Sequence, residues 1–357
     1  MATIEERLAA LETKLAALTE TTPTTYYEHQ YSGEEIDAAV GRALTGGALD
    51  TSVTNVSNQL GTFVRPNLLD NWYFGNPVNQ MGGTEWLSSS SSAIPCVDRW
   101  TWWGQYITGT RLNLLDDGLQ LAKPAEGQGL YQAIIQKVEK TRVPVGATVT
   151  LSALVKAEAD ASVVLAINDP YNVLSVQANV WELITFTVNA PSVEQTYSVS
   201  IQRNSGGIAF TVKAVKLELG SNQTLAHREG DKWVLNETPD YGDQLRRCLM
   251  YCRVDDFTES YTVAAFGVAV SETYWRGLLP SYSDMRTKPT IAIIGDNPSV
   301  QLIGNGQSIN IAGLGPTVIS AKTTGTAIGF NGVSGLAANQ TYALQLHRCK
   351  IIRSADL

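Results

Sequence analysis

The sequence is poor in the residues from which most catalytic and metal centres are built. Its 357 residues include only three histidines, namely His29, His227 and His347, and only four cysteines. So few histidines leave little material for a Ser-His-Asp or Cys-His centre. Four cysteines in a chain of this length do not make a disulfide scaffold, which is typical of a protein made in a reducing cytosol.

The chain is also poor in charge, and the charge that it carries is mostly negative. Charged residues make up 17%, against roughly 25% in an average chain, and the formal net charge is −8. An acidic chain lacks the basic face that nucleic acid or an anionic membrane requires, so we expect neither as a partner of the whole molecule. No run of roughly 18 apolar residues predicts a membrane helix, and residues 1–20 lack the apolar core of a secretory signal.

An apolar repeat spaced alternately by three and four residues dominates the first eighteen positions. Leucine at the a positions with isoleucine at one d position favours three or four strands. Arg7 at a g position can meet Glu12 at an e position of a neighbouring chain. We therefore predict a trimeric coiled-coil stalk over residues 1–20; a single amphipathic helix packed on its own domain stays open as the alternative, because the repeat is short. The seam consists of Met1, Ile4, Leu8, Leu11, Leu15 and Leu18.

Residues 21–63 predict a linker followed by a second stalk segment. Pro23 ends the first helix, and Ser32 with Glu35 forms a capping box that begins a short helix. Gly46 and Gly47 end that helix. A second apolar repeat runs from Leu49 to Phe63, which needs partner chains to cover its apolar edge.

From residue 64 onward the pattern is mainly β. Short runs alternate in polarity, as in the stretch 147–155, and glycine, asparagine and proline separate them. This predicts a jelly-roll β-sandwich over residues 64–229. Thr238 and Pro239 are expected to cap a helix of about fourteen residues. Short strands follow that helix, so residues 230–357 are predicted to form a smaller β module with one helix.

Several segments resemble phage and prophage tail-fibre proteins. They occur in the same order as in that group, and Leu249-Met250 departs from its more usual Gln-Arg. The closing strand of the resembling module is also similar to those of carbohydrate-binding jelly rolls. The segments are Asn67-Leu-Leu-Asp-Asn-Trp-Tyr-Phe74, Asn79-Gln80, Val97-Asp98-Arg99-Trp100, Val215-Lys-Leu-Glu-Leu-Gly220, Leu245-Arg-Arg-Cys-Leu-Met-Tyr251, Asp284-Met-Arg-Thr-Lys-Pro-Thr290 and Ser354-Ala-Asp-Leu357.

The resemblance implies a homotrimeric virion fibre or receptor-binding protein, assembled in the cytoplasm of a bacterial host. Its partners would be itself, other virion proteins through the N-terminal region, and a host surface glycan or protein. It implies no catalytic residue and no cofactor. Two alternatives remain: a purely structural head-fibre, collar or baseplate component, and a polysaccharide-degrading tail enzyme.

Aromatic residues are the candidates for ligand binding, because a sugar site needs flat rings beside polar groups. Trp100 and Trp102 share one face of a predicted strand and are expected in the sandwich core, whereas Trp103 takes the other face. The candidate ring residues are Trp86, Trp103, Tyr106, Tyr131 and Tyr171.

Metal and acid chemistry have weaker signals. Cys248, Cys252, His347 and Cys349 could form a zinc site, but paired cysteines inside a helix are loose for zinc, and buried thiols are the favoured reading. No motif marks the carboxylate pair that a glycosidase needs, so we predict no enzyme and no metal. Calcium at a sandwich edge remains the alternative for three acids, Asp116, Asp117 and Asp169.

Overall fold

The computed structural model describes residues 3–20, 65–87, 93–104, 110–123, 132–204, 207–280, 285–311, 313–322 and 325–355. The chain divides into two units, Met1–Phe63 and Val64–Leu357. The linker, short helix and second stalk segment predicted for residues 21–63 lie outside the described residues.

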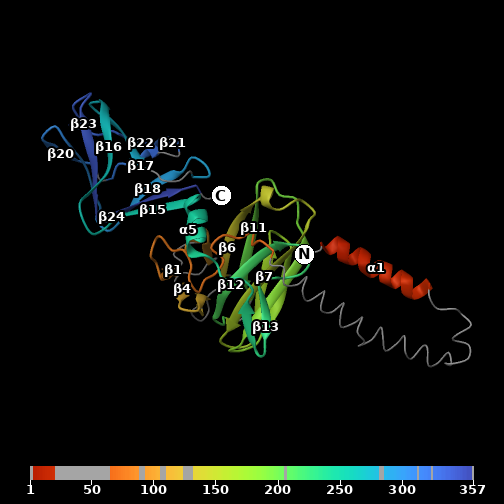
Figure 1. Cartoon of the computed structure of the whole chain (residues 1–357). Helices are drawn as coiled ribbons and strands as arrows, with labels where there is room; N and C mark the ends of the chain where they lie inside the picture. Colours follow the sequence, from red (N-terminus) through yellow and green to blue (C-terminus); the bar gives the residue numbers. More distant parts are fainter. Residues whose placement is uncertain are drawn as a thin grey trace, which may run out of the picture. The chain divides into compact units, whose positions relative to one another are not determined.

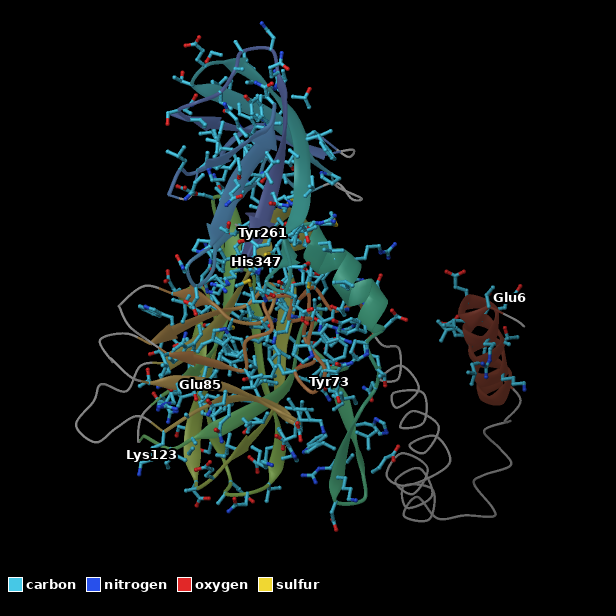
Figure 2. The ribbon with its side chains drawn as sticks, turned by 90° about the vertical axis from the view of Figure 1, so that its left-hand side faces the viewer. Glu6, Tyr73, Glu85, Lys123, Tyr261 and His347 are labelled. Atoms are coloured by element: carbon cyan, nitrogen blue, oxygen red, sulfur yellow. The ribbon has the colours of Figure 1, made fainter. Side chains whose placement is uncertain are left out.

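The N-terminal helix α1 (Ile4–Glu20) begins with a capping box formed by Thr3 and Glu6. The Thr3 amide donates to the Glu6 carboxylate at 2.8 Å, and the Glu6 amide donates to the Thr3 hydroxyl at 3.2 Å. The predicted seam residues Ile4, Leu8 and Leu11 are 69%, 57% and 62% exposed. Figure 2 shows the side chains of α1 projecting all around the helix.

The other seam positions of α1 are described only in part. Met1 and the side chains of Leu15 and Leu18 lie outside the described residues. Arg7 and Glu12 are exposed. The ion pair between chains that the sequence suggests for them stays a prediction. No helix in the described part of the chain is both long enough and apolar enough to cross a membrane.

Two six-stranded antiparallel sheets form a β-sandwich in the first half of the larger unit (Figure 1). The first sheet holds β1 (Glu85–Leu87), β4 (Arg111–Leu115), β5 (Gly118–Leu121), β12 (Phe210–Leu219), β7 (Thr148–Ala157) and β10 (Trp181–Asn189), in that order. The second holds β2 (Ile94–Pro95), β3 (Thr101–Gly104), β6 (Gln132–Glu139), β11 (Thr196–Arg203), β8 (Ala161–Ile167) and β9 (Tyr171–Val176).

The strand order confirms the predicted jelly roll. From β5 to β12 the chain switches sheets at every step except the β8–β9 hairpin, which gives β5-β12-β7-β10 opposite β6-β11-β8-β9. This is the eight-stranded double Greek key of a jelly roll. A hairpin of β13 (Ala226–Glu229) and β14 (Lys232–Leu235) follows, and the predicted boundary after residue 229 falls at its turn.

The sandwich core contains the residues that alternation predicts. Trp100 and Trp102 are 1% and 0% exposed, which confirms their expected place inside. Val149, Leu151 and Val155 of β7 are likewise fully buried. Each indole removes a large apolar area from water, so these rings contribute strongly to the stability of the sandwich.

The second half of the larger unit consists of one helix and two further sheets. Helix α5 (Tyr241–Leu249) is followed by a sheet of β15 (Cys252–Phe257), β24 (Cys349–Ser354) and β18 (Thr290–Ile294). The other sheet holds β20 (Gln307–Asn310), β19 (Ser299–Gly304), β23 (Thr341–His347), β16 (Thr262–Ser271), β17 (Tyr274–Pro280), β22 (Gly325–Asn331) and β21 (Thr317–Lys322). A separate core that includes Trp275, Phe330 and Tyr342 lies in these strands.

The helix prediction was wrong in its start and its length. Asp240 caps α5 by accepting a hydrogen bond from the Asp243 amide at 2.8 Å, so the helix begins after Thr238 and Pro239. It ends after nine residues, where Met250 is the C-cap residue and the chain enters β15. The two sheets of the C-terminal module agree with the predicted β-rich character.

Asn71 ties the jelly roll to α5. Its backbone adopts the left-handed conformation, with φ of 52°, and its amide donates to the Gln244 side chain of α5 at 2.7 Å. The Asn71 side chain donates to the carbonyls of Val78 and Asp98 and accepts from the Val78 amide. The Trp100 indole in turn donates to the Asn71 carbonyl at 2.9 Å. One buried asparagine therefore connects four separate segments.

Gln80 makes a second connection, to the strand that follows α5. Its side-chain nitrogen donates to the Cys252 carbonyl at 3.0 Å, and its side-chain oxygen accepts from the Val254 amide at 3.2 Å. The Gln80 amide donates to the Asp98 carboxylate. Gln80 thus pairs with β15 much as a neighbouring strand would, which fixes the C-terminal module to the jelly roll.

Glu139 at the end of β6 makes a third connection. It accepts hydrogen bonds from the Tyr251 hydroxyl at 2.6 Å and from Nε of Arg286 at 2.8 Å. Burial on its own would raise the pKa of Glu139, but the bonds from Tyr251, its own backbone amide and Arg286, with the charge of Arg99, lower it overall. Burial and the bond to Glu139 raise the pKa of Tyr251 to about 12.

We expect Asn71→Ala to destabilise the protein by about 2–4 kcal/mol, because it leaves several buried backbone groups without partners. Urea denaturation followed by tryptophan fluorescence measures this. Asn297→Ala is the matched control, because Asn297 is exposed and has the same φ of 52°. Equal losses for both variants would mean that backbone strain, and not the hydrogen bonds, explains the effect.

We expect the stabilisation from Glu139 to disappear at low pH. Since folding lowers its pKa below the ordinary 4.5, its contribution is complete above that pH and is lost as the pH falls through the folded value. The melting temperature of Glu139→Gln should therefore lie below that of the unmodified protein at pH 7 and approach it as the pH falls below 4.5, the ordinary pKa. The exposed Glu85→Gln serves as control, and a difference that persists unchanged at low pH would refute the assignment.

Candidate functional site

Two residues of the predicted aromatic set share one face of the second jelly-roll sheet. Strand register places Trp103 in line with Ala133, Gln202, Val164 and Val173, each on its own strand. Directly paired residues project from the same face of a sheet. Because the core residue Trp102 points inward, this row points outward.

The neighbouring row carries the second aromatic residue. Register aligns Thr101, Ile135, Ser200, Ala166 and Tyr171 across the same five strands. These positions lie two residues away from the first row on every strand, so they share its outward face.

Trp103 and Tyr171 therefore lie on opposite margins of one outward face. The four gaps between five strands, at about 4.8 Å each, separate β3 from β9 by roughly 19 Å. Tyr171 is 65% exposed, and Trp103 is half-buried. We call this surface the aromatic face and define it by Trp103, Ser200, Gln202, Ala166 and Tyr171.

Polar and apolar side chains share the middle of the aromatic face. Ser200 and Gln202 lie there beside apolar neighbours, which are Ala133, Ile135, Val164 and Ala166. The Gln202 amide donates to the Ser200 hydroxyl at 2.7 Å, which orients the amide along the sheet. Flat rings with hydrogen-bonding side chains between them suit an extended ligand that carries many hydroxyl groups.

A cavity of about 430 Å³ lies at the Tyr171 end of the aromatic face. Its lining combines the phenol ring with amide and carboxylate groups, which can hydrogen-bond hydroxyls while the ring stacks on C–H groups. The lining residues are Val164, Ala166, Asn168, Asp169, Tyr171, Gln202, Arg203 and Asn204.

Arg203 supports this cavity from inside the sandwich. It is 1% exposed, and its guanidinium donates to the carbonyls of Leu121 and Ala122 and to the Gln132 side chain. Burial lowers its pKa to about 10, which leaves it charged at neutral pH. Its donors are directed into the protein, so it holds β11 in place and does not turn the cavity into an anion site.

The other predicted aromatic residues do not join this face in the described structure. Trp86 lies on β1 in the opposite sheet, pairs with the buried Leu112, and packs partly buried against the sandwich core. Tyr106 and Tyr131 lie outside the described residues. Register explains the separation, since β1 extends the first sheet and β3 the second.

The acids and thiols considered for metals are dispersed. Asp117 pairs with Lys156 at 3.0 Å beside the β4–β5 turn, whereas Asp169 lines the Tyr171 cavity. All four cysteines are thiols without a disulfide, and burial raises the pKa of Cys349. Among the described residues, no group of three or more histidine, cysteine and acid side chains could hold a metal ion.

The sequence analysis did not identify the polar residues of the aromatic face, Ser200 and Gln202. Ser200 and Gln202 lie two residues apart on β11, and period-two alternation says only that they share a face, not which rings lie on either side of them. The pairing of β11 with both β6 and β8 supplies that information.

No protein-family model matches the chain, and no curated protein matches it. Solved structures similar to it include one titled "CBM4 structure and function", at 16% identity and a TM-score of 0.25, over 42% of this chain and 99% of that one. A xylan-binding CBM22-2 domain from Paenibacillus barcinonensis Xyn10C matches at 13% identity and 0.25, over 43% and 99%.

A third similar structure is a CBM29-2 mutant complexed with mannohexaose, at 14% identity and a TM-score of 0.22, over 38% of this chain and 91% of that one. All three of these structures are carbohydrate-binding modules.

Proposed function

We propose that the protein is a non-catalytic, homotrimeric virion fibre protein that binds a host surface glycan through the aromatic face of its jelly roll. The observation that carries the binding proposal is the pair of rings, Trp103 and Tyr171, on one outward sheet face with the polar Ser200 and Gln202 between them. A glycan fits better than a protein receptor, because rings over amides and hydroxyls match alternating C–H and O–H groups.

The absence of catalysis is proposed from the composition of the cavity. Glycoside hydrolysis generally requires two carboxylates across a cleft, about 5–10 Å apart. Asp169 is the only carboxylate among the described residues that line the Tyr171 cavity. A face with one acid and several amides can hold a sugar without cleaving it.

The trimer is proposed from the exposed seam of α1. Ile4, Leu8 and Leu11 leave an apolar stripe on the helix, and leucine at a with isoleucine at d favours more than two strands. Three linked copies would raise the effective concentration of each shallow site, so weak single contacts could still give firm attachment.

The virion role is proposed from the resembling segments and from where the structure places them. Asn71, Gln80 and Tyr251 belong to three of these segments and meet where the jelly roll joins the C-terminal module. Rigid attachment of two β modules in one unit suits a fibre, which must transmit force between particle and host. The attachment to other virion proteins is proposed to lie in the N-terminal region.

We expect the full chain to bind neutral surface oligosaccharides on a glycan array, and Tyr171→Ala and Trp103→Ala each to weaken that binding by roughly tenfold, or about 1.4 kcal/mol. Tyr241→Ala is the matched control, since Tyr241 is 46% exposed and lies on α5, outside the aromatic face. Silence of the unmodified protein on a broad array would favour a purely structural role, and release of sugar from host cell-wall material would indicate a degrading enzyme.

We expect sedimentation equilibrium at micromolar concentration to give about three times the chain mass of 38.6 kDa. Leu8→Asp should shift the mass toward that of one chain, because it puts a charge in the apolar seam. Ala10→Glu, at an outer heptad position, should leave the mass unchanged. A monomer for the unmodified protein would contradict the proposed trimer.

A further inference from the structure

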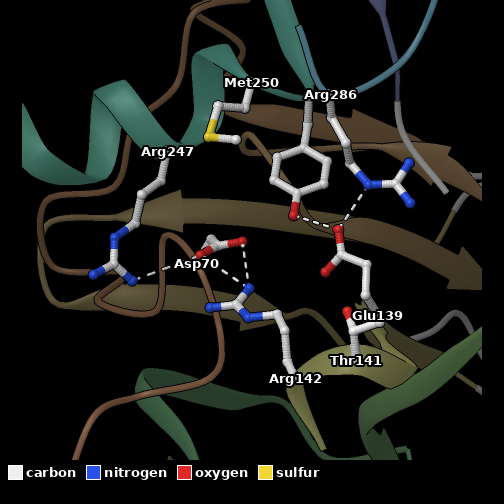
Figure 3. A pocket seen from close by; sticks show the side chains of 8 residues that line it. Asp70, Glu139, Thr141, Arg142, Arg247, Met250 and Arg286 are labelled. Carbon is white, nitrogen blue, oxygen red and sulfur yellow. Dashed lines mark hydrogen bonds and ion pairs between the residues drawn. The ribbon is translucent and has the colours of Figure 1, made fainter.

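A second cavity, of about 570 Å³, lies where the jelly roll meets α5 (Figure 3). It is distinct from the aromatic face, and none of the residues considered as ligand-binding from the sequence lines it. We call it the junction pocket. Its lining residues are Asp70, Glu139, Thr141, Arg142, Arg247, Met250, Tyr251 and Arg286.

Arginine dominates the electrostatics of the junction pocket. Arg142, Arg247 and Arg286 line it, with side chains 27%, 42% and 28% exposed. Arg99 lies behind the Tyr251 ring, 3.4 Å from the ring centroid. Counted with the nearby Asp243, four guanidiniums meet three carboxylates, in a chain whose overall charge is −8.

The ion pairs of Asp70 with these arginines are long. Arg142 approaches the Asp70 carboxylate at 3.2 and 3.4 Å, and Arg247 approaches it at 3.8 Å. Close pairs of this kind lie at about 2.7–2.9 Å. One buried carboxylate is therefore shared by several guanidiniums, and none of them holds it at short range.

Arg286 offers two further donors. Its Nε donates to Glu139, and Figure 3 shows the rest of its guanidinium directed away from that carboxylate. Among the described residues, no acceptor pairs with its two terminal nitrogens. A planar guanidinium with two adjacent donors is suited to a carboxylate or a phosphate.

The pocket also contains an acceptor that no other residue reaches. Oε1 of Glu139 receives the bonds from Tyr251 and Arg286, whereas its other oxygen, Oε2, is buried and receives no hydrogen bond from any other described residue. Burying a carboxylate oxygen without a donor is costly. A ligand hydroxyl would satisfy it, which an inorganic anion cannot do when fully ionised.

We propose that the junction pocket binds an acidic sugar unit, whose carboxylate or phosphate contacts the terminal nitrogens of Arg286 and one of whose hydroxyls donates to Oε2 of Glu139. Arg142 and Arg247 lie beside Asp70, apart from Arg286 (Figure 3), and add positive charge to the pocket. The exposed thioether of Met250 at the rim can contact the apolar side of the sugar ring. The junction pocket and the aromatic face are different sites, so either can bind without the other.

Isothermal titration calorimetry on the full chain at low salt tests this proposal, with trigalacturonic acid and glucose 6-phosphate as acidic probes. Maltotriose serves as the neutral probe, and inorganic sulfate, which carries no hydroxyl at neutral pH, serves as the sugar-free probe. Because maltotriose can also bind the aromatic face, the probes are compared on the Tyr171→Ala variant as well. On that variant we expect at least one acidic sugar to bind and both of the other probes to bind at least tenfold more weakly. The acidic sugar that binds identifies carboxylate or phosphate as the recognised group.

Arg286→Gln should weaken the binding of the acidic sugar at least tenfold, because it removes charge-assisted donors. Arg246→Gln is the control: Arg246 lies on α5 next to the pocket residue Arg247, its side chain is 79% exposed, and it does not line the pocket. Tyr171→Ala should also leave this affinity unchanged, which separates the junction pocket from the aromatic face.

Three outcomes would overturn the proposal. They are maltotriose binding to the Tyr171→Ala variant as tightly as the acidic sugars, inorganic sulfate binding as tightly as the acidic sugars, and no binding of either acidic sugar to the unmodified protein at millimolar concentration. Since the last result concerns the unmodified protein, it does not depend on how well any variant folds.

Discussion

The contact between the jelly roll and α5 depends on a buried polar residue. Asn71 occupies a left-handed backbone conformation in which its amide, carbonyl and side chain all bond to other segments. Each core can be built by one module alone, but the bond from the Asn71 amide to Gln244 exists only when α5 lies against the jelly roll. Unsatisfied buried backbone groups are expensive, so separating the modules would cost more than the apolar area between them suggests. The junction pocket has a fixed shape for the same reason, because its two walls cannot slide past each other without breaking these bonds.

The local sequence pattern predicted which segments form strands or helices. Where these segments begin and end depends on contacts with residues that are distant in sequence. Alternation in 147–155 correctly gave β7 a fully buried face, and Trp100 and Trp102 are in the core as expected. The predicted start after Thr238 was wrong because the side chain that caps the helix is that of Asp240, which accepts a bond from the Asp243 amide. Arg99 shows the limit most clearly. It lies against Asp70 and Tyr251, which no local spacing can indicate.

The same limit applies to the candidate sites. The alternation of side chains along a strand correctly placed Trp103 on the face opposite Trp102. Tyr171 was chosen only because it has an aromatic ring. Their shared surface follows from the register of five strands, whose order in the sheet departs from their order in the chain. Trp86 has an equally suitable ring and was placed on the other sheet by the same topology. The junction pocket could not be predicted, because its arginines come from four segments, and each of them alone is compatible with a solvated surface charge.

The negative net charge of the chain does not prevent it from binding acidic sugars. At physiological ionic strength a charge is screened beyond about 8 Å, so an anion at the junction pocket responds mainly to the guanidiniums that line it. The acidic remainder of the surface acts instead on long polyanions, whose distant charges it would meet one after another. Such a surface distinguishes short anions from long ones. It permits a single acidic unit to bind in an arginine-lined cavity, and it disfavours nucleic acid, which needs a continuous basic surface. In a trimer, three such cavities and three aromatic faces would together favour a polymer that presents neutral sugars with acidic units at intervals, because only that ligand can occupy both kinds of site.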